Sequence, residues 1–80
     1  PEAEKIARHA IADLNAGNAG ELLGVLREDP HSITYRFSAD IRGYRGWEWH
    51  VVLSGDTEHP TLNELALIPG DKALLAPPCP

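Results

Sequence analysis

The chain has few of the features that place a protein in a membrane or in an oxidising compartment. Cys79 is its single cysteine, so no disulfide can form within the chain. No apolar run approaches the roughly 18 residues that a membrane-spanning helix needs, and the first residues do not follow the pattern of a secretory signal. We therefore expect a soluble, cytoplasmic protein without membrane contact.

Positive charge is also scarce. The sequence carries 7 lysines and arginines against 12 acidic residues, and its formal net charge is −5. This acidity disfavours general affinity for nucleic acids, which requires cationic contacts. The charge is uneven, because residues 33–50 hold three bases and two acids (+3 − 2 = +1) and the remainder holds four bases and ten acids (+4 − 10 = −6). Residues 33–50 thus form a mildly basic segment that favours an acidic partner.

The 80 residues fit a single small domain (1–80), which we expect to be excised from a longer protein and to have a flexible proline-rich end at 77–80. Apolar residues recur at helical spacing from Glu2 to Asn15, which predicts an amphipathic helix. Gly17 is expected to end this helix, since glycine adopts the left-handed cap at little cost.

The rest of the chain has the patterns of strands and turns. Residues 18–20 are expected to form a loop. Period-two alternation and apolar runs predict strands at 22–28, 32–38, 47–53 and 62–68. A last short apolar segment at 73–76 is expected to pair at an edge of the sheet. Together these elements predict an α+β fold in which one N-terminal helix packs on a three- to four-stranded antiparallel meander sheet.

The stretch GYRGWEW at residues 43–49 holds both tryptophans and one of the two tyrosines. Trp47 and Trp49 lie two apart, so they project from the same face of the predicted strand, and at least one of them must belong to the core of so small a domain. Gly43 and Gly46 are expected to supply the backbone angles that reverse the chain at residues 42–46. Tyr44 and Arg45 then lie at the tip of this reversal, either as a solvated hairpin tip or as a recognition site.

The segments YRF, GYRGWEW, LIPG and ALLAP follow one another between Tyr35 and Pro77. In this order and at these separations they resemble the actinobacterial family known as domain of unknown function three-thousand-and-twenty-seven, over roughly half of the chain. The family is named for its lack of an assigned activity, so the resemblance implies no catalytic or ligand residues. Its pattern commonly continues into a tryptophan-bearing tail, which leaves open whether Cys79 stands in a position usually held by tryptophan.

The sequence matches none of the usual spacings of catalytic or metal-binding residues. The candidate metal ligands have no zinc-site spacing: they are His31, His50, His59 and Cys79. A triad of His50, Ser54 and Asp56 fails because four strand residues span about 13 Å. Glu48 and Glu64 could form a pair of carboxylates across neighbouring strands. The alternative is that both are solvated charges at the surface. We therefore predict a non-enzyme without cofactor or metal.

Two functions stay open. The first is a non-catalytic protein-binding or regulatory module with an unidentified protein partner, in which an exposed sheet edge also offers a homodimer contact. Its candidate binding residues are Arg36, Arg42, Tyr44, Arg45 and Trp49. The alternative is single-stranded nucleic-acid binding through residues 35–49, in which Tyr35, Tyr44 or Trp49 stacks on bases and the arginines contact phosphates.

Overall fold

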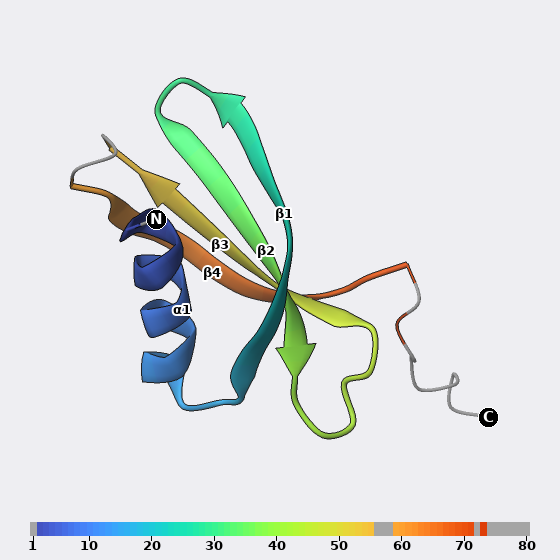
Figure 1. The fold of residues 1–80 in the computed structure, drawn as a ribbon. Coiled ribbons are helices and arrows are strands. Elements are labelled where there is room, and N and C mark those ends of the chain that lie inside the picture. The colour runs from blue at the N-terminus through green and yellow to red at the C-terminus, as the bar shows by residue number, and fades with distance from the viewer. Residues whose placement is uncertain (1, 56–58, 72, 74–80) are drawn as a thin grey trace.

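A computed structural model describes residues 2–55, 59–71 and 73 of the chain. One helix precedes four strands: α1 (Glu2–Leu14), β1 (Asn18–Asp29), β2 (Ser32–Asp40), β3 (Trp47–Ser54) and β4 (Thr61–Pro69). The strands form one antiparallel sheet in the order β1-β2-β3-β4, so each strand pairs with its neighbour in sequence (Figure 1). The predicted α+β fold is confirmed, and the four strands of the described sheet are within the predicted three to four.

Helix α1 lies along one face of the sheet (Figure 1). Ala7 and Ile11 are completely buried on its inner side, as the helical spacing of the apolar residues predicts. The helix ends at Leu14, one residue earlier than expected, and Asn15 rather than Gly17 ends it. Asn15 takes the left-handed conformation (φ 57°), and its N–H donates to the carbonyl of Ala12 at 3.1 Å. Asparagine tolerates this conformation because its short side chain bonds locally.

Gly17 does not cap the helix as predicted; it allows close packing against Ile41. A side chain at this position would overlap the side chain of Ile41, which follows β2. The missing Cβ therefore lets the connection between α1 and β1 pass close to the end of β2.

Strand β1 begins at Asn18, so the loop predicted at residues 18–20 is wrong. Asn18 pairs with Asp40 and Ala19 with Ala39, and this pairing overrides the local preference of asparagine and glycine for turns. The register then shifts between Ala19 and Leu22, between Leu22 and Gly24, and between Arg27 and Asp29. These irregularities are why β1 lacks the clear alternation of β2 and β3.

The core lies between α1 and the two central strands. Phe37 pairs with Trp49 and Tyr35 with Val51, so the odd-numbered side chains of β2 and β3 meet on the face that carries the helix. The buried residues of this core are Ala7, Ile11, Tyr35, Phe37, Trp49, Val51 and Leu53. The even-numbered side chains of these strands project from the opposite face, which we call the helix-free face.

Two predictions fall at the end of the chain. Ala73 is the only residue of the predicted segment 73–76 within the described part, and its N–H donates to the carbonyl of Gly70 at 3.1 Å in a turn. The predicted flexible end at 77–80 lies outside the described residues.

Candidate binding surface at the β2–β3 loop

The loop between β2 and β3 is built by two successive turns. The N–H of Tyr44 donates to the carbonyl of Ile41, and the N–H of Trp47 to the carbonyl of Tyr44, each at 3.1 Å. Gly43 and Gly46 have φ values of 88° and 84°, which side chains rarely adopt. The prediction that these glycines supply the angles of the reversal is confirmed.

The loop is also tied to the end of β4. The N–H of Gly70 donates to the carbonyl of Gly46 at 3.0 Å, and Trp47 pairs with Pro69 in the sheet. These contacts fix the base of the loop against a second strand, so its exposed residues extend from an ordered support.

Tyr44 and Trp47 form an aromatic pair at this loop. Their ring centroids are 5.1 Å apart and their planes are inclined at 77°, which is the favourable edge-to-face arrangement. Trp47 is half-buried, whereas Tyr44 keeps 39% of its surface exposed. The tyrosine ring is thus held in place while much of it faces solvent.

Arg42 and Arg45 flank Tyr44 in sequence, and both are exposed. Neither guanidinium forms an ion pair or hydrogen bond with any of the residues that the structure describes. Among the described residues the loop therefore carries two positive charges without a partner, one before and one after an exposed tyrosine in the sequence. Arg42, Tyr44 and Arg45 are the predicted binding residues that the fold brings together.

Trp49, also predicted as a binding residue, lies in the core instead. Its side chain is 2% exposed, and its indole N–H donates to the carbonyl of Asn18 at 3.2 Å. The reason is its central position on β3, where it lies between Phe37 of β2 and Leu67 of β4. A ring in this position cannot meet a partner at the surface, so the candidate surface excludes it.

Arg36 lies on the helix-free face, away from the core that holds Trp49. Its guanidinium makes two bonds to Glu48, from Nε to Oε1 at 3.0 Å and from Nη2 to Oε2 at 3.1 Å. Nε2 of His50 lies 3.0 Å from Oε1 of the same carboxylate. The charge of Arg36 is therefore already paired within the protein, and this arginine adds no uncompensated charge to the loop.

The pairing with Arg36 is also visible in the electrostatics of Glu48. Hydrogen bonds from Arg36 and then from His50 lower the pKa of Glu48 below its usual value, although burial acts in the opposite direction. The Glu48 carboxylate in turn raises the pKa of Arg36. We did not predict this cluster from the sequence. The sequence does indicate that Arg36, Glu48 and His50 lie on one face, because all three have even numbers on the two predicted strands. To recognise them as a cluster one also needs the register of the sheet, in which Arg36 pairs with His50.

The carboxylate pair that the sequence left open does not form. Glu48 pairs with Ile68 and Glu64 with Val52, so the two acids are four positions apart along the sheet.

Within the described residues no group of three or more histidines, cysteines, aspartates and glutamates is placed to hold a metal ion. No described helix is both long and apolar enough to cross a membrane.

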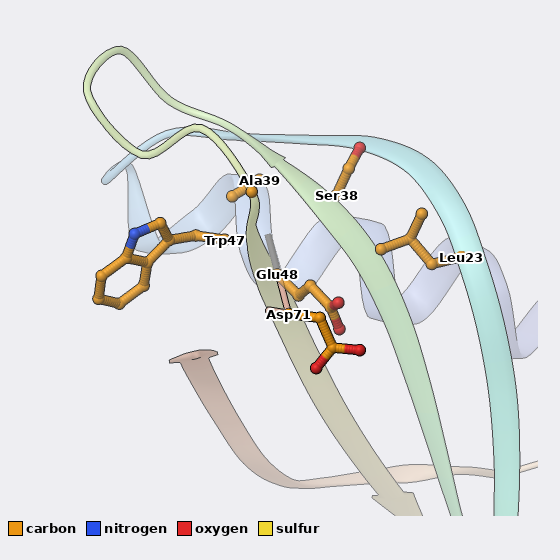
Figure 2. Close-up of a pocket in the computed structure, with 7 residues that line it drawn as sticks. Leu23, Ser38, Ala39, Trp47, Glu48 and Asp71 are labelled. Atoms are coloured by element: carbon orange, nitrogen blue, oxygen red, sulfur yellow. The ribbon is translucent and has the colours of Figure 1, made fainter. Parts of the chain in front are cut away.

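A shallow depression of about 340 Å³ lies next to the loop. Leu23, Ser38, Glu48 and Asp71 line it, and the Trp47 ring turns away from them to the side of the loop (Figure 2). The depression is also lined by Ala39 and Gly46. Glu48 in this hollow is already engaged by Arg36 and His50, whereas Asp71 forms no ion pair or hydrogen bond with the described residues.

Comparison with known proteins gives one family. The family model described as "Protein of unknown function (DUF3027)" matches residues 20–79. Two proteins from Mycobacterium tuberculosis strains and one from Mycobacterium bovis, each named as an uncharacterized protein, are 43% identical to the chain over 74 aligned positions. The alignment covers 89% of this chain but only 28% of each relative, so the chain spans less than a third of their length. No solved structure matches.

The family match includes all four strands except the first two residues of β1, and it contains the whole β2–β3 loop with its two glycines. Together with the resemblance of GYRGWEW, LIPG and ALLAP, it establishes that the chain belongs to the actinobacterial DUF3027 family.

Proposed function

We propose that this chain is a non-catalytic module that binds an acidic segment of a partner protein through the β2–β3 loop. The proposal is carried by one observation: the ring of Tyr44 contacts Trp47 edge-on and yet remains exposed, and the arginines before and after it in sequence pair with no described residue. Tyrosine and arginine are enriched among the residues that dominate protein interfaces. Supporting the ring before binding reduces the entropy lost when a partner immobilises it.

Charge supports an acidic partner. The exposed residues 42–46 carry two arginines and no acid, in a chain whose formal net charge is −5. An acidic segment is therefore attracted to this loop and repelled by most of the remaining surface, so that charge orients the encounter.

A protein partner fits better than single-stranded nucleic acid. Nucleic-acid platforms stack successive bases on several exposed rings, and two of the three rings on which that function depended, Tyr35 and Trp49, lie in the core. Arg36, one of the arginines that this function would use, is paired with Glu48. The single cysteine fits a reducing compartment, so we place the module in the cytoplasm.

The proposal is tested by titrating the isotope-labelled chain, followed by NMR, with a glutamate-rich peptide that contains aliphatic residues. We expect the amide resonances of Arg42, Tyr44 and Arg45 to move first. A parallel titration uses an oligothymidylate of similar charge. If the same resonances shift at a lower concentration of oligonucleotide than of peptide, the nucleic-acid alternative is favoured. If the peptide shifts only resonances of α1, the assigned surface is contradicted.

A matched pair of variants separates the loop from net charge. Arg42→Ala/Arg45→Ala should weaken peptide binding by roughly tenfold or more, because it removes both unpaired charges beside Tyr44. Lys5→Ala/Arg27→Ala changes the net charge equally at exposed positions of α1 and β1. Equal losses in the two variants would show that the peptide responds only to overall charge.

A further inference from the structure

Gly70, the residue after β4, lies against the base of the β2–β3 loop. Its N–H donates to the carbonyl of Gly46 at 3.0 Å, and it directly follows Pro69, which pairs with Trp47. A Cβ added at Gly70 would lie 2.7 Å from the carbonyl oxygen of Gly46 and 2.7 Å from Oε2 of Glu48. The missing side chain therefore allows a close approach that other residue types do not permit.

Space alone accounts for a glycine at this position. Among the described residues, the glycines with positive φ are Gly17, Gly43, Gly46 and Gly55. Gly70 is not one of them, so its backbone angles do not disfavour a side chain. A side chain at position 70 is excluded by its neighbours.

Neither of these neighbours moves aside at little cost. The carbonyl of Gly46 is part of the backbone. The carboxylate of Glu48 is held by two bonds from Arg36, at 3.0 and 3.1 Å, and by Nε2 of His50 at 3.0 Å. An unattached glutamate would rotate away from a new side chain, whereas this one would first lose its partners. The Glu48 cluster therefore fixes the place where Gly70 meets the loop.

The position of Gly46 in turn affects the exposed residues of the loop. Gly46 lies between Arg45, whose charge has no partner among the described residues, and Trp47, whose ring contacts Tyr44 edge-on. A displacement of Gly46 thus moves both the arginine and the support of the tyrosine ring.

We infer that Gly70 is a positioning residue of the β2–β3 loop: by fitting between Gly46 and Glu48, it sets where Arg45 and the Tyr44 ring are held. The inference rests on the proposed function, because it concerns how the same loop meets an acidic segment. Gly70 acts on binding through Gly46. A loop that is held in place before binding loses less conformational freedom when a partner attaches.

Two glycine substitutions at opposite ends of β3 test the effect on binding. Gly70→Ala should weaken binding of the glutamate-rich peptide by roughly fivefold or more, because the new methyl group displaces Gly46. Gly55→Ala is the control: its φ of 96° also makes a side chain unfavourable, but it follows the end of β3 that is far from the loop. Unchanged affinity of Gly70→Ala, or an equal loss in both variants, would overturn the inference.

The chain without peptide gives a second measurement, which does not depend on the proposed function. In Gly70→Ala the nuclear Overhauser contacts between the rings of Tyr44 and Trp47 should weaken, whereas Gly55→Ala should retain them. Retained contacts in Gly70→Ala would overturn the inference even if the unchanged chain binds the peptide. If the unchanged chain does not bind the peptide but these contacts weaken in Gly70→Ala alone, the proposed function fails and the positioning role of Gly70 is supported.

The unchanged chain gives a third measurement, which decides the matter if Gly70→Ala does not fold. Coupling between two sites is reciprocal, so saturating peptide should slow hydrogen exchange of the Gly70 amide by roughly fivefold or more. The amide of Gly55, which donates to the carbonyl of His31 at 3.2 Å, is the reference. Exchange of the Gly70 amide that peptide leaves unchanged, or slows only as much as that of Gly55, would overturn the inference.

Discussion

At the scale of single residues, the two tryptophans of GYRGWEW have different surroundings although they lie on the same side of β3. Trp49 is enclosed by the central strands and bonded to Asn18, whereas Trp47 begins the strand and supports Tyr44 at the loop. Position along the strand therefore decides which indole is core and which belongs to the candidate surface. A core tryptophan with a satisfied N–H stabilises the fold by burial without a polar penalty.

Gly17 gives a residue-level prediction about close packing. Gly17→Ala should lower the free energy of unfolding by at least about 2 kcal/mol, because the new methyl group overlaps Ile41 and the backbone angle is unfavourable for side chains. Gly43→Ala is the control: its φ of 88° is also unfavourable, but nothing lies within 4 Å of the added carbon, so about 1 kcal/mol is expected. Urea unfolding measures both, and equal losses would contradict the packing role of Gly17.

Glu48 gives a residue-level prediction about pH. Its pKa is lower in the folded chain than its ordinary value of 4.5, since Arg36 and His50 bond to the ionised carboxylate. The unfolded chain therefore binds more protons in acid. The stabilisation is complete above about pH 5 and is lost as the pH falls through the folded pKa.

Unfolding measured in urea from about pH 7 to pH 3 should accordingly show the stability of the unchanged chain falling more steeply than that of Glu48→Gln. The difference between the two should shrink in acid, where the carboxylate is protonated in both states of the unchanged chain. A constant difference over the whole range would mean that the charge of Glu48 does not contribute. Glu64→Gln, on an exposed part of β4, serves as the control.

At the scale of the elements, Arg8 connects α1 to the sheet by two contacts and makes a third within the helix. The guanidinium of Arg8 lies 4.7 Å from the centre of the Phe37 ring, donates to the carbonyl of Gly20, and is 3.2 Å from Glu4 on the same helix. It thus bridges the first helix, the start of β1 and the core face of β2.

Arg8→Met should therefore destabilise the chain by roughly 1–2 kcal/mol, because methionine retains the apolar stem but neither donates to Gly20 nor contacts Phe37 as a cation. Lys5→Met, an exposed position on the same helix, should change the stability by less than about 0.5 kcal/mol. Thermal unfolding of both variants checks the prediction, and similar losses would indicate that only the charge of the helix matters.

At the scale of the whole molecule, the elements do not share the core equally. Strands β2 and β3 are paired on both sides and supply five of the seven buried core residues, whereas α1 supplies two and contacts the sheet on one side only. Local opening of the helix therefore exposes less apolar surface than opening of the central strands.

Amide hydrogen exchange should reveal this order. We expect the amides of Tyr35, Phe37 and Val51 that are bonded in the sheet to exchange only by global unfolding, and those of α1 to exchange through a smaller opening. Arg8→Met should increase exchange in α1 more than in β3. Uniform protection of helix and sheet would instead show that the two open as a single unit.

The sequence on its own was sufficient for the order of the helix and the main strands, for at least one core tryptophan in GYRGWEW, and for the glycine-based reversal at residues 42–46. These properties depend on spacing and backbone angles within a few residues, which a local pattern contains. The tertiary structure decided the remainder: the start of β1 at Asn18, the role of Gly17 beside Ile41, and the cluster of Arg36, Glu48 and His50. Each depends on which residues of different strands are opposite one another, and the register that sets this is determined by packing of the whole sheet.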